Sequence, residues 1–174
     1  MSTNMWFISD THFSHKNIIQ FCRGEFSSID EMNEYMIEQW NARIGPRDRV
    51  IHCGDIFFGS KNAFLENIAP RLNGHIELVI GNHDNPHFLV RHNVVHKIHM
   101  WLPLKKYGLL VSHVPLHQDQ LFRGSYDGKT HALNIHGHIH EKESPEGPYR
   151  NICVEQTGFK PLHIDEIRMD LYNG

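Results

Sequence analysis

Short apolar runs in this sequence end in side chains that could bind a metal ion or move a proton. The apolar residues 78–80 predict a buried strand, and Gly81 permits a sharp turn directly behind it. Asn82 then offers a carbonyl oxygen to a metal, and His83 offers an imidazole that can carry a proton. The stretch therefore predicts a metal ligand and an acid–base group side by side.

Two earlier apolar runs end in the same way. Residues 5–8 are continuously apolar, as is typical of a strand covered on both faces, and Asp10 and His12 follow them. These two residues are two positions apart, so in an extended chain their side chains point the same way and could share one metal ion. The next predicted strand, residues 49–53, is followed by Asp55.

The first half of the chain alternates strands and helices. A capping box at Ser28–Glu31 predicts the start of a helix that Gly45 and Pro46 end. Residues 62–72 predict a second helix, frayed or kinked at Pro70. Right-handed crossovers make the three strands parallel, so their carboxyl ends meet at the edge where α/β sheets bind ligands. Five candidate residues are expected at that edge: Asp10, His12, Asp55, Asn82 and His83.

The second half of the chain is richer in strands. Its predicted elements are strands at 96–99, 109–112, 132–135 and 149–154, with a turn at 107–108 between the first two strands. Residues 164–171 could form a strand or a short helix, and a helix is favoured at their end. His113 directly follows the second of these strands, and His138 and His140 follow the third. More imidazoles are therefore expected near strand ends.

The residues that follow the strands form a set of oxygen and nitrogen ligands without thiolates. They are Asp10, His12, Asp55, Asn82, His113, His138 and His140. Such a set suits Mn²⁺, Fe, Zn²⁺ or Ni²⁺. Seven ligands are too many for one ion but sufficient for two if one carboxylate bridges them. Two ions roughly 3.5–4 Å apart can hold a hydroxide and clamp an in-line displacement at phosphorus.

Composition limits the classes of protein to which the chain could belong. With 174 residues, 40% hydrophobic and 21% charged, it is expected to fold as one domain over residues 1–174. No apolar run is long enough for a membrane span, and the N-terminus lacks a signal-peptide pattern, so a cytoplasmic protein is expected. Three cysteines without a paired motif indicate reduced thiols. A net charge of −3 argues against a broad nucleic-acid surface, although bound cations could make one site positive.

Five motifs, in this order, resemble the blocks of the calcineurin-like metallophosphoesterase superfamily. They are Asp10-x-His12, Gly54-Asp55, Gly81-Asn82-His83-Asp84, His113 and Gly137-His138-x-His140. Residues 9–19 and 161–167 are similar to those of the small stand-alone bacterial and phage members of the superfamily. The resemblance implies an α/β fold of four layers, an α-β-β-α sandwich with two mixed β-sheets flanked by helices.

The resemblance also implies how the ligands divide between two metal ions. Its two sets are Asp10, His12, Asp55 and His140 for the first ion, and Asp55, Asn82, His113 and His138 for the second, with Asp55 as the bridge. His83 would bind no metal and would act on the leaving-group or phosphoryl oxygens as the catalytic residue. Mn²⁺ is the favoured ion, with Fe, Zn²⁺ and Ni²⁺ as alternatives.

One departure from the family pattern limits the substrate. Protein phosphatases of the superfamily have an Asp that orients the catalytic His and an Arg that clamps phosphate, where this chain has Phe58 and Gly59. This argues against a Ser/Thr protein phosphatase and leaves the partner of His83 open. Asp84 is a candidate partner, although adjacent side chains often point apart.

Further residues on loops could overhang the site and contact substrate. The candidates are His15, Arg23, Arg123 and Lys129, for each of which a solvated loop position is the alternative. Most other histidines, including His52 and His136, are expected to be structural or on the surface.

The sequence predicts a dinuclear metal-dependent phosphoesterase. Phosphodiesters on small nucleotides are the favoured substrates, with phosphomonoesters also open. A metal-dependent nuclease is the alternative among enzymes, and a non-catalytic scaffold of the same fold is the alternative outside them. A scaffold is expected to have lost ligands, and here none is missing. The expected partner is a small phosphate ester; the oligomeric state is left open.

Overall fold

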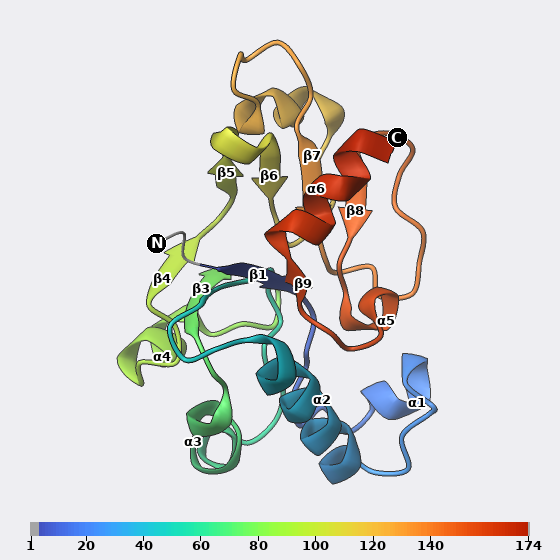
Figure 1. Ribbon diagram of the computed structural model, residues 1–174. Helices are drawn as coiled ribbons and strands as arrows, with labels where there is room; N and C mark the ends of the chain where they lie inside the picture. Colours follow the sequence, from blue (N-terminus) through green and yellow to red (C-terminus); the bar gives the residue numbers. More distant parts are fainter. Residues whose placement is uncertain (1–3, 174) are drawn as a thin grey trace.

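Two mixed β-sheets form the centre of the computed structural model, which describes residues 4–173 and side chains through Met169 (Figure 1). The first sheet has the strand order β4-β3-β2-β1-β9. Its strands are β1 (Met5–Ile8), β2 (Arg49–His52), β3 (His75–Val79), β4 (Lys97–His99) and β9 (Leu162–His163). Strands β1 to β4 pair in parallel, as predicted for the first three, and β9 joins β1 antiparallel.

The second sheet has the order β5-β6-β7-β8. Its strands are β5 (Leu102–Leu104), β6 (Leu109–Val111), β7 (Leu133–His136) and β8 (Tyr149–Asn151). Strand β5 is antiparallel to β6, whereas β6, β7 and β8 are parallel. The prediction that strands at 96–99 and 109–112 flank a single turn is wrong, because β4 completes the first sheet and β5 intervenes. Met100 and Trp101 connect the two sheets.

Four helices cover or border the first sheet: α1 (Ile18–Cys22), α2 (Ile29–Arg43), α3 (Lys61–Asn67) and α4 (Pro86–Arg91). As the capping box predicts, the Ser28 hydroxyl accepts the Glu31 backbone N–H at the start of α2. The helix predicted at 62–72 is divided into α3 and the 3₁₀ turn η1 (Ala69–Arg71). The interruption lies next to Pro70, which lacks the N–H that an α-helix needs.

The remaining helical segments lie in the second half of the chain. They are η2 (Lys105–Tyr107), η3 (Gln118–Gly124), α5 (Val154–Thr157) and α6 (Ile164–Asn173). The predicted C-terminal helix is therefore present, and it starts directly after β9. No helix in residues 4–173 combines the length and the apolar character needed to cross a membrane.

Alternation along the strands separates the layers. In β1, Phe7 faces the core between the sheets, whereas Ile8 faces the core beneath α2 and α3. In β6, Leu109 belongs to the core between the sheets and Leu110 packs with Leu121 of η3 on the outer face. The fold class predicted from the family resemblance is confirmed: two mixed sheets lie between helical layers. The outer layer over the second sheet includes the 3₁₀ segment η3.

Candidate metal centre

The seven predicted metal ligands come from strand ends of both sheets. Asp10 and His12 follow β1, Asp55 follows β2, Asn82 follows β3, His113 follows β6, and His138 and His140 follow β7. Parallel pairing places the β1, β2 and β3 ends along one edge of the first sheet, and β6 and β7 do the same in the second. The fold therefore gathers side chains that are up to 130 residues apart in the sequence, from Asp10 to His140.

One group of ligand atoms surrounds Oδ1 of Asp10. His12 Nε2 lies 3.6 Å from this oxygen, and His140 Nε2 lies 4.0 Å from it. Two atoms that each lie ~2.1 Å from one ion are roughly 3.0–3.5 Å apart at octahedral to tetrahedral angles. Asp10, His12 and His140 can therefore bind one ion after a small contraction.

A second group surrounds the side-chain oxygen of Asn82. This oxygen lies 2.9 Å from His113 Nε2 and 2.9 Å from His138 Nδ1. The two imidazole nitrogens are 3.2 Å apart. All three separations fit atoms that share one octahedral ion, so these residues form a compact second ligand set.

The carboxylate of Asp55 joins the two groups. Its Oδ2 lies 3.5 Å from His12 Nε2 in the first group and 3.5 Å from His113 Nε2 in the second. Its Oδ1 points elsewhere and accepts the backbone N–H of His83 at 2.8 Å. One oxygen of Asp55 thus lies within 3.5 Å of a nitrogen of each ligand group.

Unsatisfied polar atoms in the first group fit a bound cation. Oδ1 of Asp10 and Nε2 of His12 are buried and have no hydrogen-bond partner. Buried polar atoms are almost always satisfied in folded proteins, so such a pair calls for an explanation. A divalent ion between a carboxylate oxygen and an imidazole nitrogen would satisfy both. The residues present therefore fit the metals that the sequence predicted.

Hydrogen bonds behind the ligands orient two of the imidazoles. His113 places Nδ1 2.8 Å from the Cys53 carbonyl oxygen, and His140 places Nδ1 3.0 Å from Oε1 of Glu155. Each oxygen can only accept, so each Nδ1 carries the proton and each Nε2 presents a lone pair to the centre. The tautomers are those required for metal binding.

The Asp10 carboxylate is held on its far side. Its Oδ2 accepts hydrogen bonds from the Ser9 hydroxyl at 2.5 Å and the His138 backbone N–H at 2.9 Å, with the Cys153 thiol at 3.3 Å. Burial alone would raise the pKa of Asp10, but the interaction with His12 and these donors lower it well below its usual range. Asp10 is therefore ionised, with Oδ1 left for a metal.

Five of the seven candidate ligands adopt left-handed backbone conformations that are uncommon outside glycine. The φ angles are 55° for Asp10, 45° for His12, 59° for Asp55, 70° for His138 and 50° for His140. Such residues cost free energy and concentrate at functional sites. All five lie in the turns that follow the carboxyl ends of β1, β2 and β7.

Arg23 is buried beneath the Asp10 turn, so the prediction that it overhangs the candidate metal centre is wrong. Its side chain is 0% exposed, and its guanidinium donates to the backbone carbonyls of Asp10 and Thr11 and to Glu155. The sequence placed Arg23 on a loop, but Glu155 lies 132 residues away and supplies the charge that makes burial possible. Arg23 fixes the left-handed turn at Asp10 and is not positioned to bind substrate.

Glu155, the partner of Arg23, has a role that the sequence analysis missed. Its Oε1 bonds both the Arg23 guanidinium, at 2.8 Å, and His140 Nδ1, at 3.0 Å. Burial would raise its pKa, yet His140 and Arg23 bring the pKa below its ordinary value. Glu155 follows a short apolar run, 152–154, which is the same signal that identified the other carboxylates.

Two glycines allow the turns to approach the carboxylates. A Cβ atom at Gly81 would overlap the Asp55 carboxylate, and a Cβ atom at Gly137 would overlap Ser9 and the Asp10 carboxylate. Glycine is needed at both positions for this close approach of backbone and ligand.

Asp84 is not the partner of His83, which corrects one candidate from the sequence. Its carboxylate accepts the backbone N–H groups of Asp55, Ile56 and Gly81 at 2.8–3.0 Å. These bonds tie the turn after β2 to the turn after β3. Burial nevertheless raises the pKa of Asp84.

His83 lies in a group of rings beside the first ligand set. Its ring is 5.6 Å from that of His12 and 5.4 Å, edge-on, from that of Phe58. His15 stacks on Phe58 at 4.4 Å and lies 5.5 Å from His12. His83 and His15 therefore both border the candidate centre, and their contact with substrate stays a prediction.

The two other predicted substrate contacts lie between β6 and β7. Arg123 is exposed, and its guanidinium lies 5.7 Å over the ring of Trp101. Lys129 is exposed in a turn organised by Asp127, which accepts its backbone N–H at 2.8 Å. Arg123 thus contacts Trp101. The contact of Lys129 with substrate stays a prediction.

Two other histidines are structural, as expected. His52 is fully buried beside Thr11, at 2.9 Å, and burial lowers its pKa to about 3. His136 is buried, with its ring nitrogens near Ser144 and the Gly137 carbonyl.

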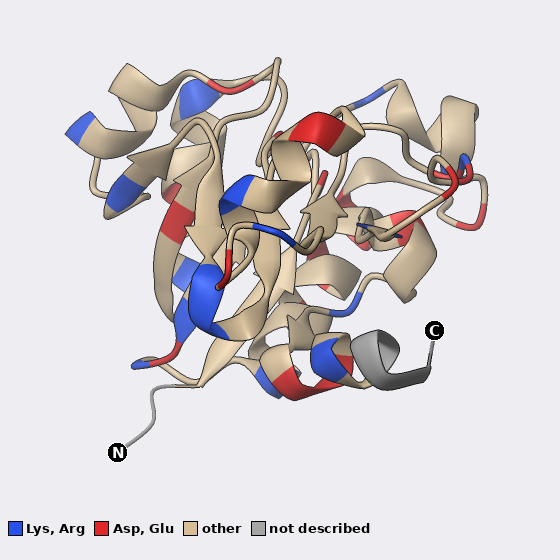
Figure 2. Cartoon of the chain, turned by 90° about the horizontal axis from the view of Figure 1, so that it is seen from above, with Lys and Arg blue, Asp and Glu red and all other residues tan. Residues whose placement is uncertain are grey.

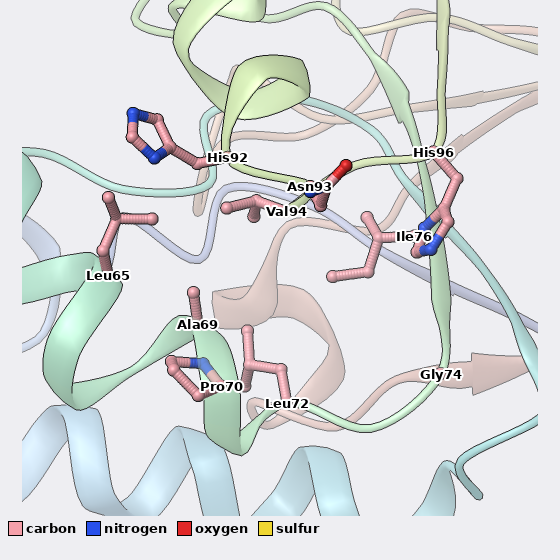
Figure 3. A pocket seen from close by; sticks show the side chains of 10 residues that line it. All are labelled: Leu65, Ala69, Pro70, Leu72, Gly74, Ile76, His92, Asn93, Val94 and His96. Carbon is pink, nitrogen blue, oxygen red and sulfur yellow. The ribbon is translucent and has the colours of Figure 1, made fainter.

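A pocket of about 200 Å³ lies away from the candidate ligands (Figure 3). It is bordered by α3, η1, β3 and the segment after α4, and residues such as Leu65, Leu72 and Val94 line it. None of the seven candidate ligands is among its lining residues. The chemistry therefore belongs to the strand-end cluster and not to this pocket.

Comparison with known proteins agrees with this site. A profile of the calcineurin-like phosphoesterase superfamily domain matches residues 4–152. The chain belongs to this superfamily, and membership supports metal-dependent hydrolysis of phosphoesters as the general class of activity.

Several relatives are similar over most of their length. Uncharacterized protein MJ1445 of Methanocaldococcus jannaschii is 32% identical over 171 residues, covering 94% of this chain and 88% of the relative. Gene 66 protein of Mycobacterium phage L5 is 28% identical, covering 79% of this chain and 78% of the relative. The crystal structure of the protein of unknown function AQ665 from Aquifex aeolicus superposes with a TM-score of 0.72 at 28% identity, covering 97% of this chain and 99% of that chain.

Proposed function

We propose that this protein is a dinuclear metal-dependent phosphoesterase of the cytoplasm, which hydrolyses small phosphodiesters, nucleotide diesters foremost, or phosphomonoesters. The supporting observation is the position of Asp55 Oδ2, at 3.5 Å from a ligand nitrogen of each of the two groups. A carboxylate oxygen shared in this way suits a pair of divalent ions, for which Mn²⁺ is our first choice.

The protein's own groups would position the substrate and manage its charge. Two divalent ions in such a centre activate water and stabilise the charge of a phosphoryl group in an in-line displacement. Asp10 and Asp55 would hold the ions from the first sheet, and His113 and His138 would hold one from the second. His83 lies beside His12 without belonging to either ligand group, so its ring is free to protonate the leaving oxygen or to stabilise phosphoryl charge.

The alternatives have less support. Lys and Arg are spread over several helices, strands and loops and are mixed with Asp and Glu (Figure 2). This distribution, with a net charge of −3, disfavours a nuclease that tracks a long nucleic acid. Phe58 replaces the acidic residue of the protein phosphatases and stacks on His15, which disfavours phosphoprotein substrates. A scaffold without catalysis has no need of unpaired ligand atoms on Asp10 and His12.

A substrate screen tests the proposal. Protein stripped with a chelator and reconstituted with Mn²⁺ would be assayed on dinucleotides, cyclic nucleotides, monoesters, single-stranded nucleic acid and phosphoserine peptides. We expect metal-dependent turnover of a small phosphoester and little turnover of the peptides. Hydrolysis restricted to nucleic acid or phosphopeptides, or no hydrolysis of any phosphoester under any metal, would contradict the proposal.

A further inference from the structure

A second, apolar pocket adjoins the second ligand set. It has a volume of about 310 Å³ and is lined by Ile80, Gly81, Asn82, Met100, Trp101, His113 and Val114. Asn82 and His113 are two of the candidate ligands, so one wall of the pocket is also a wall of the metal centre. The pocket lies where β3, β6 and the connection between the two sheets meet.

Three large apolar side chains of this pocket are open to solvent. Met100 is 75% exposed, Val114 is 40% exposed and Trp101 is 38% exposed. Exposed apolar side chains gathered in a concavity beside polar groups are typical of a small-molecule site.

The chemistry of the lining selects a flat ring as the occupant. Trp101 offers a π-face for stacking, and the Met100 thioether is a favourable neighbour for aromatic groups. The volume is at the small end of the range for ligand pockets, roughly 300–1,000 Å³. It suits one ring system better than a peptide or an oligonucleotide.

Arg123 adds a positive charge to the rim. Its guanidinium lies 5.7 Å over the Trp101 ring, and its Nε donates to Gln120 at 2.9 Å. These two contacts position an exposed cation beside Trp101, which lines a pocket that shares Asn82 and His113 with the candidate metal centre. An aromatic phosphoester presents the matching pair of features, a flat ring and an anion.

We propose that the Met100–Trp101–Val114 pocket binds the planar aromatic group, such as a nucleobase or an aryl ring, of a phosphoester whose phosphate lies at the metal centre. The inference rests on the proposed function and extends it by assigning the pocket that recognises the aromatic part of the substrate. Trp101 is the specificity-determining residue.

Binding of two phosphonates that cannot be hydrolysed tests this pocket directly. Benzylphosphonate carries an aromatic ring and methylphosphonate does not, so calorimetric dissociation constants on Mn²⁺-loaded protein compare the ring alone. We expect Trp101→Ala to weaken the binding of benzylphosphonate about tenfold, equivalent to about 1.4 kcal/mol, and to leave the binding of methylphosphonate unchanged. Trp101→Phe keeps a ring and should retain most of the affinity. Tryptophan fluorescence of the wild type should change on adding benzyl alcohol to metal-free protein, and the change should vanish in Trp101→Phe.

A matched control is available in a separate apolar pocket. Val90, with Pro86, His87, Arg91 and Ile98, lines a cavity of about 370 Å³ that contains none of the candidate ligands. Val90→Ala should alter neither dissociation constant.

Each remaining outcome has a distinct meaning. If benzylphosphonate binds no more tightly than methylphosphonate, or if Trp101→Ala weakens both equally, the pocket proposal is wrong. If the ring preference depends on Trp101 but no phosphoester is hydrolysed, the pocket is supported and the proposed catalytic function fails. A Trp101→Ala protein that does not fold is replaced by Met100→Ala, since Met100 is the most exposed of the three side chains; the same ring-selective loss is expected.

Discussion

His140 donates its Nδ1–H to Oε1 of Glu155 across 3.0 Å, so a carboxylate that faces away from the metal centre fixes the ring that faces into it. Glu155 also accepts a hydrogen bond from the Arg23 guanidinium, which in turn donates to the Asp10 carbonyl. One buried carboxylate therefore connects the candidate ligand His140 to Arg23. This connection couples the candidate metal centre to buried residues outside its seven predicted ligands.

Removal of Glu155 should weaken one metal site selectively. Glu155→Ala frees the His140 ring to rotate and to change tautomer, and loss of such partners typically lowers metal affinity 10–100-fold. A two-site titration against a chelating dye should show one weakened site and one nearly unchanged. Glu143→Ala, which changes an exposed carboxylate, is the control. Two unaltered sites in Glu155→Ala would argue against this positioning role.

Asp55→Asn should impair both metal sites together. Its Oδ2 lies at equal distances from the two ligand groups, and an amide is a much weaker bridging ligand than a carboxylate. Metal analysis of reconstituted wild type should give two ions per chain, and the variant should retain one ion or none. Asp119→Asn, on an exposed segment, should retain both. A wild type that saturates with a single ion would refute the dinuclear assignment.

His83→Gln should reduce catalysis without emptying the metal sites. The contact between His83 and the Asp55 carboxylate is made by the His83 backbone N–H, which the substitution preserves. A general acid contributes about 10²–10⁴-fold, so kcat should fall by that order. The loss should be smaller for a nitrophenyl ester, whose leaving oxygen needs little protonation. Loss of a metal ion from the variant would show that His83 is a ligand.

Burial of His52 should make the metal-free protein less stable in acid. Its folded pKa of about 3 lies below the ordinary value of 6.5, so between these pH values the unfolded chain binds the extra proton. The contribution of neutral His52 to the free energy of unfolding is therefore fully present above pH 6.5, and it decreases as the pH falls from 6.5 toward 3. At pH 5 the loss is roughly 2 kcal/mol.

Urea unfolding at pH 7 and pH 5, with a chelator present, measures this loss. In His52→Gln the decrease in unfolding free energy between the two pH values should shrink by about 2 kcal/mol. His87→Gln, which changes an exposed histidine, should keep the full decrease. An equal decrease in all three proteins would exclude His52 as its source.

The candidate ligands could be predicted from the sequence because apolar runs end directly before them. Asp10, Asp55 and Asn82 each follow one of three parallel strands of the same sheet, so one rule of topology gathers them. The pairing of the second sheet could not be predicted in this way, since β5 has only three residues and lies close to β4 in sequence. The arrangement of β4 and β5 in different sheets depends on packing between layers, which no local pattern carries.

Long-range partners explain the errors at the site. An arginine on a polar loop is usually solvated, and only the distant Glu155 makes the burial of Arg23 favourable. Asp84 was considered for His83 because the two are neighbours, but three backbone N–H groups from two turns surround its carboxylate. Both cases depend on contacts between chain segments whose proximity the sequence alone does not reveal.

The left-handed turns at the ligands have a consequence for how such a protein changes over generations. Glycine is the residue that most readily adopts the conformation of Asp55 or His138, so a mutation to glycine there would relax the backbone while deleting a ligand. Most mutations that abolish an activity also reduce the stability of the fold. At Asp55 or His138, the relaxed backbone would offset part of the stability that a substitution by glycine removes. In a lineage no longer selected for hydrolysis, we expect these positions to drift first, leaving inactive descendants that remain well folded.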